Sequence, residues 1–378
     1  MNQWRFILFF SIVLSLYGLL NFYIFVHGWG VVQGSLLEEP YLVLFLVFSL
    51  SFVGGRFLER VRLSWLSSLL VWVGAFWLAA MVYFLLAVLA IDLIRLVNYL
   101  VPIIPDGLSK EVVAAVVCSV VVGIVVLGHV NALTPRIKVL EFTIPKNGHR
   151  LQTLDIAVAS DIHLGTIVCK ARLERIVAKI NELKPDLVLL PGDVIDEDIG
   201  PVIKQNLGET LRKIQARYGV VAITGNHEYI GGVDAACKYL VEHGVSVLRD
   251  SSVKIEDSVY IVGREDRAIG QFARRKRKSL DELMASVDVS CPVILMDHQP
   301  FKLDEAERCK VDLQLSGHTH HGQLWPFNFI TRSIYEVSWG YTKKGSTHIY
   351  VSSGVGTWGP PVRTGNRPEI VHLKLRFA

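Results

Sequence analysis

Residues 317–322 read Gly-His-Thr-His-His-Gly, and they form the last of five short polar clusters that each follow an apolar run. The other four clusters are Asp161-Ile162-His163, Gly192-Asp193, Gly225-Asn226-His227-Glu228 and Asp297-His298. Open α/β sheets place their ligands just beyond the carboxyl ends of strands. We therefore expect the clusters to bring carboxylates, an amide oxygen and imidazoles to strand ends in one half of the protein.

The spacing and type of these residues point to metal binding. In an extended chain, residues i and i+2 face the same way, so Asp161 and His163 can hold one ion together. Asp193 follows a glycine, which lets the backbone and a metal approach closely. Oxygen and imidazole ligands without thiolate favour Mn, Fe or Zn. The inventory suits two divalent ions that share a carboxylate, an arrangement that activates water against a phosphate ester.

The N-terminal part of the chain is almost continuously apolar. The whole chain has 51% hydrophobic and 20% charged residues, which is too apolar for an ordinary soluble protein. Four charge-free runs stand out, at Phe6–Val26, Pro40–Gly55, Leu63–Ile91 and Val112–His129. Runs of about 18 residues or more are long enough to cross a bilayer, and the second run, of about 16 residues, is marginal by this rule. We predict four transmembrane helices. The alternatives are buried helices of a globular core and, for the first run, a cleaved signal peptide.

Basic residues in the loops predict the orientation in the membrane. Arg56, Arg60 and Arg62 lie between the second and third runs, whereas the loop between the first two runs has Glu38 and Glu39 and no Lys or Arg. The positive-inside rule then places the N-terminus and the C-terminal half on the cytoplasmic side of a plasma or inner membrane. The net charge of +4 is too slight to argue for a nucleic-acid partner.

Strand-like and helix-like runs alternate after about residue 134. The expected strands are 154–159, 186–190, 220–223, 245–248, 259–262, 292–296, 311–315, 348–351 and 370–375, and the expected helices are 171–183, 202–216, 233–241 and 279–287. Alternation early and consecutive strands late favour a mixed α/β sandwich. The sequence thus predicts a transmembrane region over 1–134, a linker over 135–150 and an α/β domain over 151–378.

The clusters carry a family resemblance. Their order and their flanking text, Val-Ala-Ser-Asp-Ile-His-Leu-Gly, Leu-Pro-Gly-Asp, Ile-Thr-Gly-Asn-His-Glu and Leu-Ser-Gly-His-Thr-His, resemble the calcineurin-like metallophosphoesterase superfamily from about residue 155 to the C-terminus. The late segments 352–356, 361–363 and 367–370 resemble its bacterial membrane-associated branch. The resemblance implies a four-layer sandwich of two mixed sheets flanked by helices.

The resemblance also implies residue roles. Asp161, His163 and His320 would hold the first ion, Asn226, His298 and His318 the second, and Asp193 both, with His227 as the catalytic histidine. Two positions depart from the branch's usual pattern. His321 stands where a second glycine is usual, and Asp297 stands where a small residue often precedes the histidine. His321 and Arg363 are the expected substrate contacts.

These observations favour a membrane-bound phosphoesterase that hydrolyses a phosphodiester or pyrophosphate bond, with a lipid-linked substrate preferred because the membrane half would confine the enzyme near it. One alternative is a phosphodiesterase or phosphatase of broad specificity on soluble nucleotides. Another is a non-catalytic membrane sensor or scaffold that binds metal. The basic run Arg274–Lys278 is either a solvated loop or a contact for anionic headgroups or a polyphosphate substrate.

Overall fold

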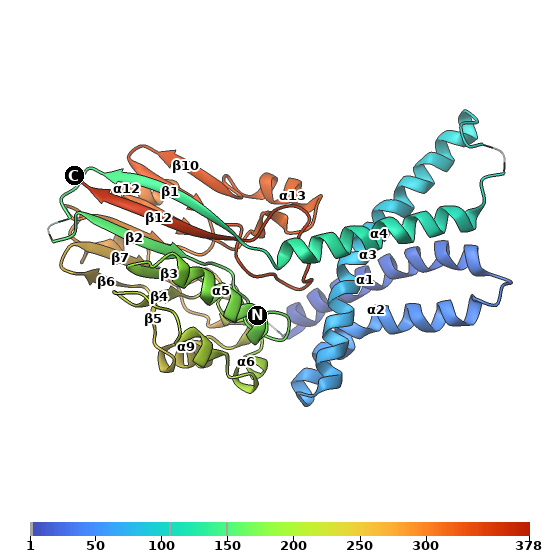
Figure 1. Cartoon of the computed structure of the whole chain (residues 1–378), viewed down its shortest axis with the longest axis horizontal. Helices are drawn as coiled ribbons and strands as arrows, with labels where there is room; N and C mark the ends of the chain where they lie inside the picture. The colour runs from blue at the N-terminus through green and yellow to red at the C-terminus, as the bar shows by residue number, and fades with distance from the viewer. Residues whose placement is uncertain (1–2, 106, 149) are drawn as a thin grey trace. The chain divides into compact units, whose positions relative to one another are not determined.

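The computed structural model describes residues 3–105, 107–148 and 150–378, and the chain divides into two compact units. One unit comprises residues 1–130 with 359–362 and the other residues 131–358 with 363–378. We refer to them as the helical unit and, after the activity that the sequence leads us to expect of it, the catalytic unit. Each is described by itself below, and Figure 1 identifies their elements.

The helical unit contains four long helices among its described residues. They are α1 (Gln3–Val32), α2 (Glu38–Val61), α3 (Trp65–Leu100) and α4 (Lys110–Ala132, which runs two residues into the catalytic unit). All four are long and apolar enough to cross a membrane, as the sequence predicted. The helices α2 and α3 pack closely, because a Cβ at Gly74 would collide with the backbone of Phe52. Ile24, Phe45 and Trp77 form a small interior cluster.

The catalytic unit contains two six-stranded sheets. The first has the order β1-β12-β2-β3-β4-β5 and the second β10-β11-β9-β8-β7-β6. The first comprises β1 (Arg136–Ile144), β12 (Glu369–Phe377), β2 (Thr153–Val158), β3 (Leu187–Pro191), β4 (Val220–Ile223) and β5 (Val245–Leu248). The second comprises β10 (Gly340–Lys344), β11 (Thr347–Val351), β9 (Leu313–Ser316), β8 (Val293–Met296), β7 (Val259–Gly263) and β6 (Ser251–Ile255). Both mix parallel and antiparallel pairs, so the predicted mixed α/β fold is confirmed.

Alternation along the strands produces the layers. In β3, Leu187 and Leu189 join the apolar cluster between the two sheets, whereas Val188 and Leu190 join the cluster on the sheet's other face. That outer face is covered by α5 (Lys170–Glu182), α7 (Leu207–Leu211) and α9 (Val233–Glu242). The outer face of the second sheet packs against α11 (Leu280–Met284) and α12 (Asp304–Arg308). Helices therefore cover the outer face of each sheet. The four layers are helices, sheet, sheet and helices, and an apolar cluster lies between each pair of neighbouring layers.

Two expected elements differ from the structure. Residues 136–144, which we expected to be part of a linker, form β1 and pair along their whole length with β12 in parallel. This strand is mostly exposed, so it lacks the apolar run that identified the other strands. The helix expected over 202–216 is broken into α6 (Gly200–Lys204) and α7, because Asn206 between them has a left-handed backbone with φ 52°.

The remaining short helices belong to the loops at the strand ends. They are α8 (Asn226–Gly231), α10 (Ile269–Phe272), the 3-10 turn η1 (His320–Gly322) and α13 (Phe327–Ile334). Ser279 caps α11, because its Oγ accepts a hydrogen bond of 3.2 Å from the backbone N–H of Glu282.

Candidate metal centre

The predicted ligands lie in the loops that follow five strands. Asp161 and His163 come after β2, Asp193 after β3 and Asn226 after β4, and these three strands are parallel neighbours. From the other sheet, His298 follows β8, and His318 and His320 follow β9. Because β8 and β9 are also parallel neighbours, each sheet delivers its ligands from the carboxyl ends of adjacent strands.

The backbone at these positions is unusual. Five of the predicted ligands have positive φ: Asp161 at 54°, His163 at 55°, Asp193 at 51°, His318 at 71° and His320 at 45°. A left-handed backbone costs a non-glycine residue about 1–2 kcal/mol. Such conformations persist only where the surrounding structure imposes them, and they cluster at functional sites. The loops therefore accept a stability cost in order to aim these side chains.

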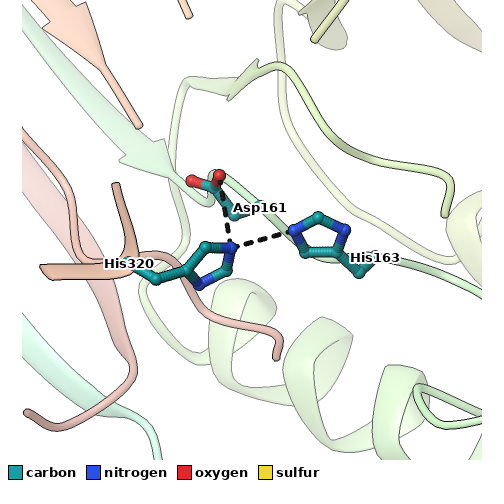
Figure 2. A group of neighbouring side chains, drawn as sticks. All are labelled: Asp161, His163 and His320. Atoms are coloured by element: carbon teal, nitrogen blue, oxygen red, sulfur yellow. Dashed lines mark hydrogen bonds and ion pairs between the residues drawn. The ribbon is translucent and has the colours of Figure 1, made fainter. Parts of the chain in front are cut away.

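One group of ligands consists of Asp161, His163 and His320, and Figure 2 shows the three side chains pointing toward one another. His163 Nε2 lies 2.9 Å from His320 Nε2, which lies 3.6 Å from Asp161 Oδ1. Ser160 Oγ donates a hydrogen bond to the second oxygen of Asp161. All three side chains are buried, so three potential ligand atoms converge on one small region.

A second group forms around Asp193. Its Oδ2 lies 3.0 Å from His298 Nε2 and 3.9 Å from His163 Nε2, so this carboxylate touches both sets of imidazoles. Asn226 Oδ1 lies 2.7 Å from His318 Nδ1 and 3.3 Å from His298 Nε2. One ligand atom each from Asp193, His298 and His318 lies within 4.8 Å of the others. The structure thus brings all seven predicted ligands together, with Asp193 between the two groups.

His227 lies beside the cluster. Its backbone N–H donates to Asp193 Oδ1 at 2.9 Å, and its Nδ1 lies 3.0 Å from Asp196 Oδ1. Its ring meets that of His163 edge to face, with centroids 4.5 Å apart. Burial by itself lowers the pKa of His227, but the carboxylates of Asp193 and Asp196 raise it to about 9. The ring is thereby held as a hydrogen-bond donor next to the ligands.

Glu228 was quoted in the motif but had no predicted role. Its Oε2 accepts hydrogen bonds from the N–H groups of Gly225 and Asp193, at 2.7 and 3.2 Å, and its Oε1 accepts one of 2.8 Å from Ile195. It ties the loop after β3 to the loop after β4. Burial and the nearby Asp193 raise the pKa of Glu228 to about 7. No sequence signal beyond its place next to His227 identified this residue.

Asp196 is the second residue that sequence analysis missed. It lies three positions after Asp193, and its Oδ1 lies 3.6 Å from His163 Nδ1 as well as beside His227. An isolated acid in a loop carries no distinctive pattern, which is why only the structure shows that it orients two of the histidines.

The two expected substrate contacts, His321 and Arg363, are both buried. Arg363 has no exposed surface; its guanidinium donates to the carbonyls of Ser353 and Gly356, and its Nη2 lies 3.0 Å from His320 Nδ1. His321 is also buried, with Nδ1 3.0 Å from Ser338 Oγ. Both side chains are held by contacts within the protein, and their roles as substrate contacts stay predictions.

The electrostatics of the cluster suit cations. Among the described residues, no Lys or Arg forms an ion pair with Asp161 or Asp193, although both carboxylates are buried. Buried charges in proteins are paired or coordinate metals. Burial, with His163 and Arg363 nearby, lowers the pKa of His320 well below its usual value, and burial with His298 lowers that of His318 to about 3. Burial disfavours the charged form of His298, but the carboxylates around it, Asp193 first, raise the pKa of this ring well above its usual value. Neutral imidazole is the form that binds metal, so the surroundings hold His318 and His320, but not His298, in that form.

An orphaned nitrogen supports the same conclusion. The buried Nδ1 of His163 makes no hydrogen bond among the described residues, because its contact with Asp196 Oδ1, at 3.6 Å, is too long for one, and its Nε2 faces another imidazole nitrogen at 2.9 Å. Oxygen and nitrogen donors in this mixture suit divalent first-row metals. The residues present therefore fit divalent cations.

Comparison with known proteins agrees with this geometry. Residues 154–322 match the model of the calcineurin-like phosphoesterase family. The chain is 32% identical over 289 residues to a transmembrane protein with a metallophosphoesterase domain from Danio rerio, which covers 73% of this chain and 65% of that protein. It is 33% identical over 225 residues to an uncharacterized metallophosphoesterase from Aquifex aeolicus, covering 59% of this chain and 85% of that protein.

A solved structure shows a weaker likeness. The dimetal phosphatase from Danio rerio is 11% identical and covers 55% of this chain and 89% of its own, with a TM-score of 0.34. A likeness at this level says nothing about activity. The chain spans less than two thirds of the length of the first curated relatives that it matches.

Proposed function

This chain belongs to the calcineurin-like phosphoesterase family, and we propose that it is a membrane-bound phosphoesterase that uses two divalent metal ions to hydrolyse a phosphodiester or pyrophosphate bond. The observation that carries the proposal is the convergence of the two ligand groups on Asp193. A single-metal site has no use for seven ligands with a carboxylate between them.

The residue roles in the proposal follow from position. Asp161, His163 and His320 would hold one ion, Asn226, His298 and His318 the other, and Asp193 both. When bound, two ions of Mn, Fe or Zn supply Lewis-acid polarisation of the phosphoryl oxygens and a nucleophile derived from water.

The protein's own side chains then orient the metal ligands and protonate the leaving group. Asp196 holds the ring of His227 through Nδ1, so Nε2 is left to donate a proton to the leaving oxygen. General acid catalysis of this kind raises the rate by about 10²–10⁴-fold. Arg363 fixes the ring of His320 from behind. Glu228 fixes the two loops that carry Asp193 and Asn226, so the ligands keep their relative positions without substrate.

The substrate class in the proposal rests on location. Four apolar helices long enough to span a bilayer make this a membrane protein, and an enzyme confined to a membrane meets amphiphilic substrates at high local concentration. We therefore favour a lipid-linked phosphodiester or pyrophosphate, hydrolysed by a catalytic unit on the cytoplasmic face of a plasma or inner membrane. The loop charges described above support that orientation.

The test is a substrate panel on purified, Mn-loaded, full-length protein in detergent. We expect turnover of a chromogenic diester such as bis(p-nitrophenyl) phosphate, and faster turnover of a detergent-presented lipid pyrophosphate. Asp193→Asn protein, purified in the same way, controls for contaminating hydrolases. Faster turnover of soluble nucleotides would overturn the proposal of a lipid-linked substrate, and the proposal of phosphoesterase activity would stand. Absence of turnover on every substrate, in protein shown to contain metal, would overturn both.

A further inference from the structure

A basic pocket lies beside the metal centre, in the catalytic unit. Its volume is about 530 Å³, within the range of small-molecule sites. Six basic side chains line it, against the two carboxylates of Glu282 and Glu305. The basic residues are Arg264, Arg267, Lys276, Arg277, Lys278 and Lys302. The predicted basic run 274–278 therefore contributes three of its residues to a concave site.

Two arginines form the fixed part of this pocket. Arg264, just after β7, donates through Nη1 to Asp297 Oδ2 at 3.0 Å and to Glu305 Oε2 at 3.1 Å. Arg277 donates through Nη1 to Asp297 Oδ1 at 2.8 Å. Arg264 is only 4% exposed, so its guanidinium is held in place before any ligand arrives. Asp297 immediately precedes the predicted ligand His298, which places this wall next to the metal centre.

The pocket keeps a surplus of positive charge. Asp297 and Glu305 are already shared between Arg264 and other cations. Among the described residues, Arg267, Lys276 and Lys278 form no ion pair with any carboxylate. The Nε of Arg264 is buried without a hydrogen-bond partner in the described chain. Arg267 lies over the ring of Phe301, and Lys278 Nζ donates to the backbone carbonyl of Asp250 at 3.3 Å, so neither contact neutralises the charge. Guanidinium forks with ammonium groups nearby are a usual environment of phosphate in proteins.

We propose that this pocket binds a phosphate group, separately from the metal centre. The ligand class is a phosphate-bearing anion, supplied either by a soluble phosphate compound or by the headgroup of an anionic lipid. A merely solvated loop would not hold Arg277 inward against Asp297, nor enclose a buried Arg264. The inference does not depend on the proposed activity, because the pocket residues include none of the predicted metal ligands.

The experiment measures binding of inorganic pyrophosphate to the full-length protein in zwitterionic detergent, after removal of metals with EDTA, by equilibrium dialysis. We expect saturable binding of one pyrophosphate per chain that weakens with added salt. Lys276→Gln/Lys278→Gln should weaken it at least about tenfold, since each lost charge-assisted contact is of that order. Both lysines are exposed, so folding should be preserved, and equal melting temperatures would verify this.

The matched control is Lys170→Gln/Lys213→Gln, which removes the same charge from two other exposed positions and should change the affinity less than twofold. Equal losses in both double variants, or no saturable binding by the wild type, would overturn the proposal. Repeating the wild-type and pocket-variant measurements in nanodiscs of phosphatidylcholine, with and without phosphatidic acid, identifies the source. Competition by phosphatidic acid that requires Lys276 and Lys278 supports a lipid headgroup as the phosphate donor, and its absence supports a soluble compound.

Discussion

The helical and catalytic units use apolar residues in opposite ways. In the helical unit most apolar side chains face outward, as with Leu127 on α4, which is 72% exposed. In the catalytic unit they face inward, as with Leu189 on β3, which is 0% exposed. Composition alone would not separate these cases. The difference teaches that the two units are built for different surroundings, because an extended outward apolar surface marks contact with a membrane or with another protein, and these helices are long and apolar enough for a membrane.

The units also differ in what they bury. The helical unit buries few charges among its described residues: Trp77 Nε1 donates to the neutral Asn21 Oδ1 at 2.9 Å, and the buried carboxylate of Glu59 is paired with Arg56 at 3.4 Å. The catalytic unit instead buries Asp161 and Asp193 among five histidines and holds several of them at positive φ. These features cost stability and are concentrated at one end of the strands. We infer that this region is arranged for chemistry, and the helical unit for residence in lipid.

Neutralising the shared carboxylate should have the largest effect. Asp193→Asn keeps the shape of the side chain but removes the charge that would bridge two cations. We expect turnover of bis(p-nitrophenyl) phosphate to fall by at least about 10³-fold, with loss of bound metal measured by mass spectrometry. Because Asp193 Oδ2 lies 3.0 Å from His298 Nε2 and, against the effect of burial, its neighbouring imidazoles hold the pKa of this carboxyl well below its usual value, the substitution leaves buried partners uncompensated, and the metal-free variant should melt below metal-free wild type. Full turnover by a metal-loaded variant would contradict the chemical role of this region.

Removing the neighbouring histidine should have the next largest effect. His227→Ala should lower turnover by about 10²–10⁴-fold while both metals stay bound, because His227 is not one of the seven predicted ligands. Asp196→Asn should give a smaller loss in kcat with little change in KM, since His227 remains but loses the carboxylate at Nδ1. Loss of metal from the His227→Ala protein would instead make this residue a ligand.

Much of the catalytic unit could be predicted because its central strands are buried on both faces. The runs that became β3, β4 and β8 are continuously apolar, and each ends at a predicted ligand. The edge strand β1 of the first sheet was harder to predict. β1 has mostly exposed side chains and is recognisable only through its pairing with β12, which lies more than 200 residues away.

The candidate metal centre likewise has a part that the sequence predicted and a part that it did not. The five polar clusters, together with the family resemblance that they carry, were enough to select the seven predicted ligands, which the structure brings together. The supporting contacts of Asp196, Glu228 and Arg363 depend on loop conformation, and no spacing encodes that. Arg363 illustrates the problem: a conspicuous arginine in a late loop suggested a substrate contact, but burial and backbone carbonyls occupy its guanidinium. Their functional roles remain predictions until tested.

Adding a Cβ to a glycine should have a smaller effect on metal affinity, and only where the backbone lies close to a ligand. A Cβ at Gly225 would collide with Asp193, at both Oδ1 and the backbone nitrogen. Gly225→Ala should therefore displace this carboxylate and weaken metal affinity by about 10–100-fold, the usual cost of disturbing a ligand's support. The matched control is Gly123→Ala on α4, where a Cβ meets nothing within 4 Å. Metal titration of both variants checks this, and equal affinities would contradict the tight packing at the ligand loops.

The smallest expected effect tests the difference in surroundings directly. Leu127→Ala on the outward face of α4 leaves no cavity inside the protein, so in detergent micelles it should change the free energy of unfolding by less than about 0.5 kcal/mol. The matched Leu189→Ala removes the same atoms from the apolar layer between the sheets and should cost about 2–5 kcal/mol. Thermal and denaturant unfolding of the two variants, followed in the same detergent, gives the comparison. A cost at Leu127 as large as that at Leu189 would mean that this face of α4 packs against protein, so the outward apolar surface would no longer mark contact with lipid.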